Sequence, residues 1–212
     1  MMEFIIDKRN YIILFIIIVL LGFIIFFPKR KPFIRTYNTH GMITITIYDK
    51  INEKKIDNNI KNICKDYTKD NDVDDINDGY DLEGAYIVKN IISLFEKEGI
   101  KNFIINENGN ISAGKNYNGG TYTISINDPL NGDVLNTLKL KNESMATVNY
   151  EGNYDSTIVL HKDNVKALAL SYYLSNKNFE EAKDICKKYS CEFYFLKDDE
   201  TYMSEGFKKI IK

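Results

Sequence analysis

The sequence predicts a single α+β domain, with a mixed or antiparallel sheet and flanking helices, preceded by one transmembrane helix. Three observations lead to this prediction. Short segments in which apolar and polar residues alternate indicate strands, and apolar residues at helical spacing indicate amphipathic helices. The two kinds of segment are mixed along the chain, which favours α+β over a doubly wound sheet. The 212 residues leave room for one moderate domain.

An apolar segment near the N-terminus predicts a membrane anchor. Tyr11 to Phe27 is uncharged and almost wholly apolar, and its 17 residues are just long enough to cross about 30 Å of hydrocarbon. Basic residues flank both ends, and the small-residue cleavage site of a signal peptide is absent. We therefore expect an N-terminal tail at residues 1–10, a transmembrane anchor at 11–27, a basic linker at 28–36 and the α+β domain at 37–212.

The first half of the domain contains two predicted helices between short strands. The alternating segment from Ile43 to Tyr48 predicts a half-buried strand. Ile56 to Tyr67 has apolar residues at helical spacing and predicts a helix, and Ala85 to Phe95 predicts a second helix that Gly99 closes. Residues 103–106 predict a short buried strand that ends in a turn.

The second half begins with a predicted hairpin, because Pro and Asn-Gly in residues 128–133 separate two alternating runs at 121–127 and 134–140. The remaining elements are expected in this order: strands near 145–149 and 156–161, a helix at 165–172, a helix from an Asn178–Glu181 capping box to Tyr189, and a strand at 192–196.

Charge and composition exclude several classes of function. Residues 1–35 carry a net charge of +4 and the whole chain carries −2, so the rest of the chain carries −6. An acidic body argues against a nucleic-acid-binding protein, which needs a basic face. The Asp-rich stretch at 70–81 is not an EF-hand loop, because positions 6 and 12 counted from Asp70 are Asp75 and Asp81 instead of glycine and glutamate.

Few cysteines and histidines limit the site chemistry further. Cys64, Cys186 and Cys191 are too few for a disulfide scaffold or a four-thiolate zinc site. Cys186 and Cys191 either form a small disulfide outside the cytosol or remain two thiols, and the sequence leaves both open. His40 and His161 leave little for a histidine-based metal site.

Several short stretches of the domain resemble the ApbE family, the FAD:protein FMN transferases, and they occur in the family's order. THGMITITIYD at 39–49 is similar to the opening strand with its Met-Gly-Thr signature, of which Gly41 is kept. Residues 81–115 resemble the Asp-Leu-Gly-Gly helix start, the helix and the Asn-x-Gly-Gly-Asn turn, and Asp81, Leu82 and Gly84 match the first of these. With further similar segments at 66–77, 121–129 and 145–154, the resemblance covers most of residues 37–175.

The resemblance implies that the protein binds FAD, breaks its pyrophosphate with a magnesium ion and attaches FMN to a Thr or Ser hydroxyl of a target protein. It places the flavin against the His40-Gly41 turn, Tyr67 and Asp81, with the backbone carbonyl of Gly84 facing the magnesium ion. It also implies that the domain lies outside the cytoplasm. The basic residues that follow the anchor, taken alone, favour a cytoplasmic domain instead.

The sequence departs from the family at the metal site. The family's late helix carries Ala-Asp-Ala-Leu-x-Thr, but Lys166 stands at the Asp position and Leu170 at the Thr position, so neither offers an oxygen ligand. A family element near the flavin, Gly-Gly-Ala-Phe-Asp, is missing between Asn77 and Asp81. Lys166 is either a solvent-exposed helix lysine or an ammonium that pairs with the pyrophosphate in place of the metal.

We therefore expect a single-pass membrane protein that binds flavin, with FAD as its cofactor and with reduced or lost magnesium-dependent FMN transfer. No catalytic residue is assigned, and the Gly84 carbonyl is the one candidate metal ligand that remains. The alternative is a non-enzymatic, membrane-tethered interaction module on the same fold, with a protein partner. The candidate flavin-binding residues are His40, Gly41, Tyr67, Asp81 and Lys166.

Overall fold

The structure is a computed structural model of the whole chain, and it describes residues 31–69, 73, 75–76, 79–116 and 119–211. The predicted tail at 1–10, the predicted anchor at 11–27 and the start of the predicted linker lie outside the described residues. The chain divides into two compact units, Met1–Lys31 and Pro32–Lys212, of which the second is called the body below. No helix in the described part of the chain is long and apolar enough to span a bilayer.

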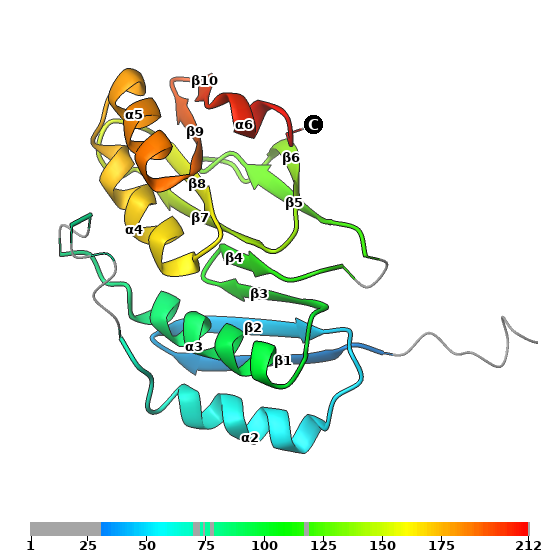
Figure 1. Cartoon of the computed structure of the whole chain (residues 1–212). Coiled ribbons are helices and arrows are strands. Elements are labelled where there is room, and N and C mark those ends of the chain that lie inside the picture. Colours follow the sequence, from blue (N-terminus) through cyan, green and yellow to red (C-terminus); the bar gives the residue numbers. More distant parts are fainter. Residues whose placement is uncertain (1–30, 70–72, 74, 77–78, 117–118, 212) are drawn as a thin grey trace, which may run out of the picture. The chain divides into compact units, whose positions relative to one another are not determined.

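The body is built on one eight-stranded sheet in which all neighbouring strands are antiparallel. Two further strands, β5 (Tyr122–Asn127) and β6 (Val134–Leu140), form a separate hairpin at the predicted place. The strand order in the sheet is β1 (Phe33–Thr39), β2 (Gly41–Ile47), β3 (Phe103–Glu107), β4 (Asn110–Ala113), β7 (Glu143–Asn149), β8 (Ser156–His161), β9 (Glu192–Lys197) and β10 (Glu200–Met203) (Figure 1).

Helices cover the sheet in two groups. Among the described residues they are α2 (Glu53–Ile63), α3 (Glu83–Lys97), α4 (Asn164–Ser175), α5 (Phe179–Tyr189) and α6 (Glu205–Lys208). Figure 1 shows α2 and α3 over the β1–β3 part of the sheet, and α4 and α5 over the β7–β9 part. The β5–β6 hairpin and α6 pack on the opposite face of that second part. The sheet is therefore sandwiched between two layers only in its second half.

Alternation along the strands supplies the cores on the two faces. Phe193 and Phe195 of β9 pack with α4 and α5, whereas Tyr194 and Leu196 pack with the hairpin and α6. A third core lies under α2 and α3 and contains the three isoleucines of β2, which are fully buried. The intervening threonines of β2 are half-buried, as expected for one covered face.

The α+β architecture with an antiparallel sheet and flanking helices is confirmed, and two local predictions hold with it. Asn178 and Glu181 form the capping box of α5, and Gly99, with φ of +70°, follows the end of α3. The sequence does not predict β1, β4, β10 or α6. β1 begins inside the segment expected to be a linker, and its buried residues, Phe33 and Tyr37, are four apart, so the strand has no alternating pattern.

A narrow polar junction joins the two halves of the sheet. β4 and β7 pair over three residues each, and the middle pair is Ser112 and Ser144. The hydroxyls of these buried serines are hydrogen-bonded at 2.9 Å. A small cavity between α3, α4 and these strands is also lined by Glu107, Asn110 and Asn164. Buried polar side chains therefore lie at the boundary between the core under α2 and α3 and the core under α4 and α5, and Tyr67 packs against both cores.

A disulfide between Cys186 and Cys191 ties the end of α5 to the start of β9, with Cα atoms 4.7 Å apart. Both cysteines are buried, and Ser190, with φ of 57°, turns the chain between them. The structure thus contains the disulfide that the sequence left open. Cys64 is a free, half-buried thiol.

We expect denatured, unreduced protein to react with one equivalent of an alkylating reagent, at Cys64, and with three after reduction, because the chain has three cysteines. Mass spectrometry of the alkylated chain measures this. A disulfide that closes so short a loop lowers the conformational entropy of the unfolded chain, which stabilises the folded state by about 2 kcal/mol. Cys186→Ser with Cys191→Ser should therefore lower the free energy of unfolding by about that amount. Three labelled thiols without reductant would contradict the disulfide.

Candidate functional site

Two turns meet at the end of the sheet where α3 begins. The β1–β2 turn contains His40 and Gly41, and the β3–β4 turn contains Asn108. The Met42 N–H donates to Asn108 Oδ1 at 2.9 Å, and the Asn108 N–H donates to the Met42 carbonyl at 3.2 Å. Gly41 has φ of +120°, and a Cβ there would lie 2.0 Å from Asn108 Nδ2. The turns pack so closely that position 41 requires glycine.

A buried carboxylate connects these turns to the start of α3. Glu107 is 6% exposed, and its Oε1 and Oε2 accept hydrogen bonds from Asn108 Nδ2 and Asn110 Nδ2, both at 3.0 Å. A Cβ on Gly84 would lie 2.5 Å from Glu107 Oε1, so the carboxylate passes directly over the first turn of α3. Burial raises the pKa of Glu107, and the two amide hydrogen bonds oppose this rise.

A second carboxylate, Glu83, contacts several polar side chains on the exposed side of the first turn of α3. Its Oε2 lies 2.6 Å from His40 Nδ1, and its Oε1 lies 2.6 Å from Lys69 Nζ. The Tyr67 ring lies edge-on to the His40 ring with centroids 6.0 Å apart, and burial together with the Glu83 carboxylate raises the pKa of Tyr67. We call His40, Tyr67, Lys69 and Glu83 the Glu83 cluster. The Lys69 ammonium holds the pKa of Glu83 below its ordinary value, which keeps the carboxylate ionised.

Most of the residues that the sequence analysis selected lie around this first turn of α3. His40 and Tyr67 belong to the Glu83 cluster, Gly41 packs against the neighbouring turn, and Gly84 lies under Glu107. Asp81 Oδ1 accepts a hydrogen bond from the N–H of Glu83 at 2.9 Å. The predicted helix at 56–67 is too long, because α2 ends at Ile63 and Tyr67 follows it in a loop.

Lys166 lies on α4, whose start is attached to α3. Asn164 Nδ2 donates to the Ala85 carbonyl at 2.7 Å, and Lys89 pairs with Asp163 at 3.0 Å. The Lys166 side chain is half-buried, and no ion pair within the described part of the chain includes it. The structure thus brings α4 beside the first half of α3 without placing Lys166 in the Glu83 cluster.

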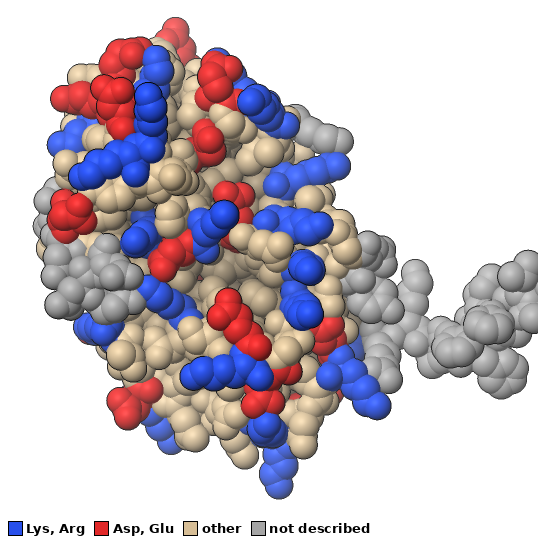
Figure 2. Space-filling model, in the orientation of Figure 1, with Lys and Arg blue, Asp and Glu red and all other residues tan. Residues whose placement is uncertain are grey.

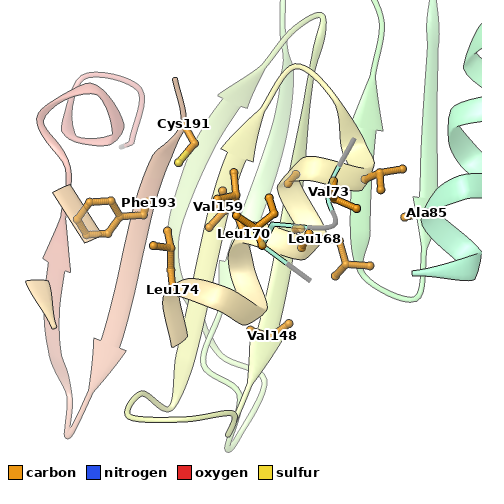
Figure 3. Packing of buried hydrophobic residues seen from close by; sticks show 14 of the residues in the cluster. Val73, Ala85, Val148, Val159, Leu168, Leu170, Leu174, Cys191 and Phe193 are labelled. Carbon is orange, nitrogen blue, oxygen red and sulfur yellow. The ribbon is translucent and has the colours of Figure 1, made fainter. Parts of the chain in front are cut away.

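Leu170, one helical turn after Lys166, is fully buried in the core under α4. Val73 and Ile76, from the segment before α3, belong to the same core and are each 1% exposed. Figure 3 shows Val73 beside Leu168 and Leu170 of α4. The two positions that the sequence resemblance aligns with family metal ligands hold an ammonium and an apolar core side chain. Within the described residues, no three His, Cys, Asp or Glu side chains are grouped to hold a metal ion. The residues present do not fit magnesium, which prefers oxygen ligands.

Sequence reasoning missed Glu83 and Glu107. Glu83 stands at the one position of the Asp-Leu-Gly-Gly element that does not match, and a carboxylate in the first turn of a helix is ordinarily explained by the helix dipole. Its contact with His40 joins residues that lie far apart in the sequence, so spacing gives no signal. Glu107 ends a short apolar strand, and a polar residue at that place predicts a turn rather than burial.

Three cavities are lined by described residues outside the Glu83 cluster. One of about 610 Å³ lies between α5 and α6, and one of about 290 Å³ lies beside the second half of α3. The third, of about 350 Å³, lies between the hairpin turn and the β3–β4 turn, where Asn106, Asn108 and Gly109 line it. The cluster is an open surface, and the His40 side chain is 47% exposed. Figure 2 shows acidic and basic side chains interspersed on the face seen in Figure 1.

Comparisons with known proteins agree with the sequence resemblance. Residues 81–166 match the model of the ApbE family. The fold is similar to the flavin transferase ApbE from Vibrio cholerae, with a TM-score of 0.67, 11% identity, and coverage of 85% of this chain and 99% of that chain. The fold is also similar to the apo form of the flavinyl transferase ApbE from Pseudomonas stutzeri, with a TM-score of 0.66 and 11% identity. That match covers 88% of this chain and 99% of that chain. No curated protein matches.

A third solved structure, the ApbE protein from Thermotoga maritima, has a TM-score of 0.61 and 14% identity, and the match covers 85% of this chain and 99% of that chain. At such low identity these structures establish the fold. The resemblance to the ApbE family is confirmed by the fold together with the family model, whose match begins at Asp81 and ends at Lys166.

Glu107→Gln should lower the free energy of unfolding by about 1–3 kcal/mol, because it puts one amide donor against another. The Met42 and Thr147 N–H groups fix both asparagine oxygens, so both Nδ2 groups must donate to residue 107. Adding Asn110→Asp supplies an acceptor for the introduced amide and should restore part of the loss. Chemical denaturation of the parent, the single variant and the double variant measures this. If Glu107→Gln alone is neutral or stabilising, relief of the buried charge outweighs the lost hydrogen bond and the prediction is wrong.

Proposed function

We propose that this chain, with its ApbE fold, is a membrane-anchored, flavin-binding protein that has lost magnesium-dependent FMN transfer. The proposal rests on one observation, namely which side chains lie at the starts of α3 and α4. Four of the five candidate flavin-binding residues, His40, Gly41, Tyr67 and Asp81, lie around the start of α3, whereas Lys166 and Leu170 stand at the metal positions that the resemblance gives on α4. This part of the flavin side is therefore kept without the Gly-Gly-Ala-Phe-Asp element, and the metal side is replaced.

Magnesium has too few ligands at this site. The ion takes near-octahedral oxygen ligands, usually with one or two carboxylates. The Gly84 carbonyl is one neutral oxygen, Leu170 lies in the apolar core, and the Lys166 ammonium would repel a dication. Glu107 is close to Gly84, but both of its oxygens already accept amide hydrogen bonds.

Flavin binding is supported by the aromatic and cationic groups around the same helix start. The edges of the Tyr67 and His40 rings offer apolar contact for a ring system, and the ammonium groups of Lys69 and Lys166 offer positive charge to a pyrophosphate. The named functions of the structural neighbours from Vibrio cholerae and Pseudomonas stutzeri point to the same ligand.

The second candidate is a non-enzymatic, membrane-tethered interaction module. One observation favours it: Val73 and Ile76 pack with Leu170 into the core beside α3 and α4. The chain's own side chains thus fill space next to the proposed flavin site, and no residue of the Glu83 cluster lines the three cavities given above. A protein partner that docks on this open surface would need neither flavin nor metal.

We place the body outside the cytoplasm in this proposal, tethered by residues 11–27. The Cys186–Cys191 disulfide supports this side, because the cytosol keeps such thiols reduced. The family resemblance implies the same side. On that side the body would meet its protein target or partner.

FAD should bind the full chain in lipid nanodiscs without magnesium-dependent FMN transfer. Saturating FAD should raise the melting temperature of the body, because a ligand that binds the folded state stabilises it. A Thr-containing acceptor domain incubated with the protein, FAD and magnesium should gain no FMN mass that a chelator abolishes. Chelator-sensitive FMN addition would contradict the proposed loss of activity. An unchanged melting temperature would favour the interaction module.

The metal positions are tested by restoring them. Lys166→Asp with Leu170→Thr should introduce magnesium-dependent thermal stabilisation if the alignment of α4 is right. Lys166→Gln with Leu170→Val is the matched control, since it removes the ammonium and shortens the core side chain without adding a carboxylate. If neither double variant responds to magnesium, the missing flavin element before Asp81, or the alignment itself, explains the loss.

Ile17→Lys with Ile18→Lys should move the protein to the soluble fraction, because two lysines at the centre of a span cost about 5–7 kcal/mol on insertion scales. Ile17→Leu with Ile18→Leu is the matched control and should stay with the membranes. Fractionation followed by a carbonate wash measures both. If the lysine variant still sediments with membranes after the wash, residues 11–27 are not the anchor.

A further inference from the structure

The cavity of about 290 Å³ beside the second half of α3 combines basic and apolar lining residues. Lys101, Lys115 and Lys162 line it, and all three are exposed residues. Within the part of the chain that the structure describes, none of their ammonium groups forms an ion pair. An anion in the cavity would therefore be attracted by three cations that have no ion-pair partner. The apolar lining includes Ile92, Ile100 and Phe103.

Strand pairing and backbone contacts set the positions of these lysines. The Lys115 N–H donates to the Lys101 carbonyl at 2.7 Å. A side chain at Gly114 would collide with the same carbonyl, so the end of β4 packs directly on the loop that follows α3. Lys162 directly follows β8, whose last residue pairs with Ser144 on another wall of the cavity. The three lysines therefore project from fixed backbone around one opening.

Two carboxylates, Glu96 and Glu143, also line the cavity. Burial raises the pKa of Glu143, the Glu192 carboxylate adds to this rise, and the Lys162 ammonium opposes it. A raised pKa favours the neutral carboxyl group, which does not repel an anion. Glu96 is exposed, so solvent screens its charge. The three lysines outnumber the two carboxylates even when both are ionised, and the cavity therefore favours an anion.

The length of the chain before β1 limits how far this cavity can lie from the membrane. The predicted anchor ends at Phe27 and β1 begins at Phe33, a distance of about 20 Å when the chain is fully extended. Phe33 pairs with Ile47, which in turn pairs with Phe103 at the cavity. Neighbouring strands lie about 5 Å apart, so Phe103 is about 10 Å from the start of β1. An anchor in the bilayer thus keeps the cavity within reach of lipid headgroups.

We propose that this cavity binds the phosphate headgroup of an anionic phospholipid in the membrane that holds residues 11–27. The three ammonium groups bind the phosphate, and the apolar lining residues contact the carbon atoms next to it. The inference rests on the proposed membrane anchoring and adds a lipid site and an orientation to it. The seven residues of β1 extend about 20 Å from this end of the sheet to the His40-Gly41 turn. The Glu83 cluster would therefore face away from the membrane, where a soluble partner can reach it.

Lysine acetylation of the full chain tests the lipid contact. The protein is placed in nanodiscs of phosphatidylcholine alone and in nanodiscs that also contain phosphatidylglycerol, and mass spectrometry measures the modification rate of each lysine. Phosphatidylglycerol should slow modification of Lys101, Lys115 and Lys162 about fivefold, the gain in binding expected for one lysine at an anionic surface. Lys183 and Lys187 of α5 should react equally fast in both nanodiscs. Equal slowing of all five lysines would overturn the inference.

A triple variant tests whether the cavity lysines hold the lipid. Phosphatidylglycerol should raise the melting temperature of the parent, because a ligand that binds the folded state stabilises it. Lys101→Gln with Lys115→Gln and Lys162→Gln should abolish this rise. The three residues are exposed, so the variant should melt like the parent in phosphatidylcholine.

The matched control removes three other lysines from the same end of the sheet. Figure 2 shows several basic side chains along the right-hand side of the body, the side on which β1 begins in Figure 1. Lys50→Gln with Lys54→Gln and Lys97→Gln changes the net charge equally without altering the cavity lining, and should keep most of the rise. Equal losses in the two triple variants would show attraction to the surface as a whole and would overturn the cavity as the site.

Soluble glycerol phosphate, added to phosphatidylcholine nanodiscs, distinguishes a lipid from a free anion. It should leave the three modification rates unchanged, and equal slowing by glycerol phosphate would contradict the lipid assignment. If the parent enters nanodiscs but phosphatidylglycerol changes neither the rates nor the melting temperature, the inference is wrong and the proposed anchor stands. If the parent does not enter nanodiscs, the proposed anchor is wrong and the lipid site falls with it.

Discussion

The buried Glu107 carboxylate is the interaction on which the candidate site depends. Its two oxygens accept from Asn108 and Asn110, and these asparagines in turn accept N–H groups from the β1–β2 turn and from β7. The same carboxylate lies over Gly84 at the start of α3. One ionisable group, 6% exposed, thus fixes a turn, a strand and a helix relative to one another. Because both asparagine amides can only donate here, position 107 requires a side chain with two acceptor oxygens.

Because the Glu107 contacts hold the start of α3 in place, the residues on the solvent side of its first turn can be substituted without loss of the fold. Glu83 gathers His40, Tyr67 and Lys69 on the solvent side, while Leu170 and its neighbours close the α4 side with apolar contacts. The ApbE fold is kept at 11–14% identity to its solved neighbours because strand pairing and core packing tolerate many apolar residues. Metal ligation tolerates few substitutions, since each ligand must offer an oxygen at a set place.

Local signals in the sequence account for most of the fold. The isoleucines of β2, the hairpin turn before β6 and the Asn178 cap each carry a pattern within a few residues, and the structure contains all three elements. β1 has no such pattern, because its buried residues are four apart. For the site, resemblance led to His40, Tyr67 and Asp81, but the pairing of His40 with Glu83 depends on how two distant segments fold together. Periodicity and spacing cannot show a contact of that kind.

The three-residue pairing of β4 with β7 is the shortest pairing in the main sheet and marks a boundary between its two halves. The other main-sheet pairings extend over four to seven residues, and the buried Ser112 and Ser144 lie between the core under α2 and α3 and the core under α4 and α5. Such a boundary lets each half open and close with its own free energy. Amide protons of β1–β3 and of β7–β9 would then exchange with solvent as two separate cooperative groups. The β1–β2 turn with His40 belongs to the first group, so a flavin bound against this turn would slow exchange in that half first.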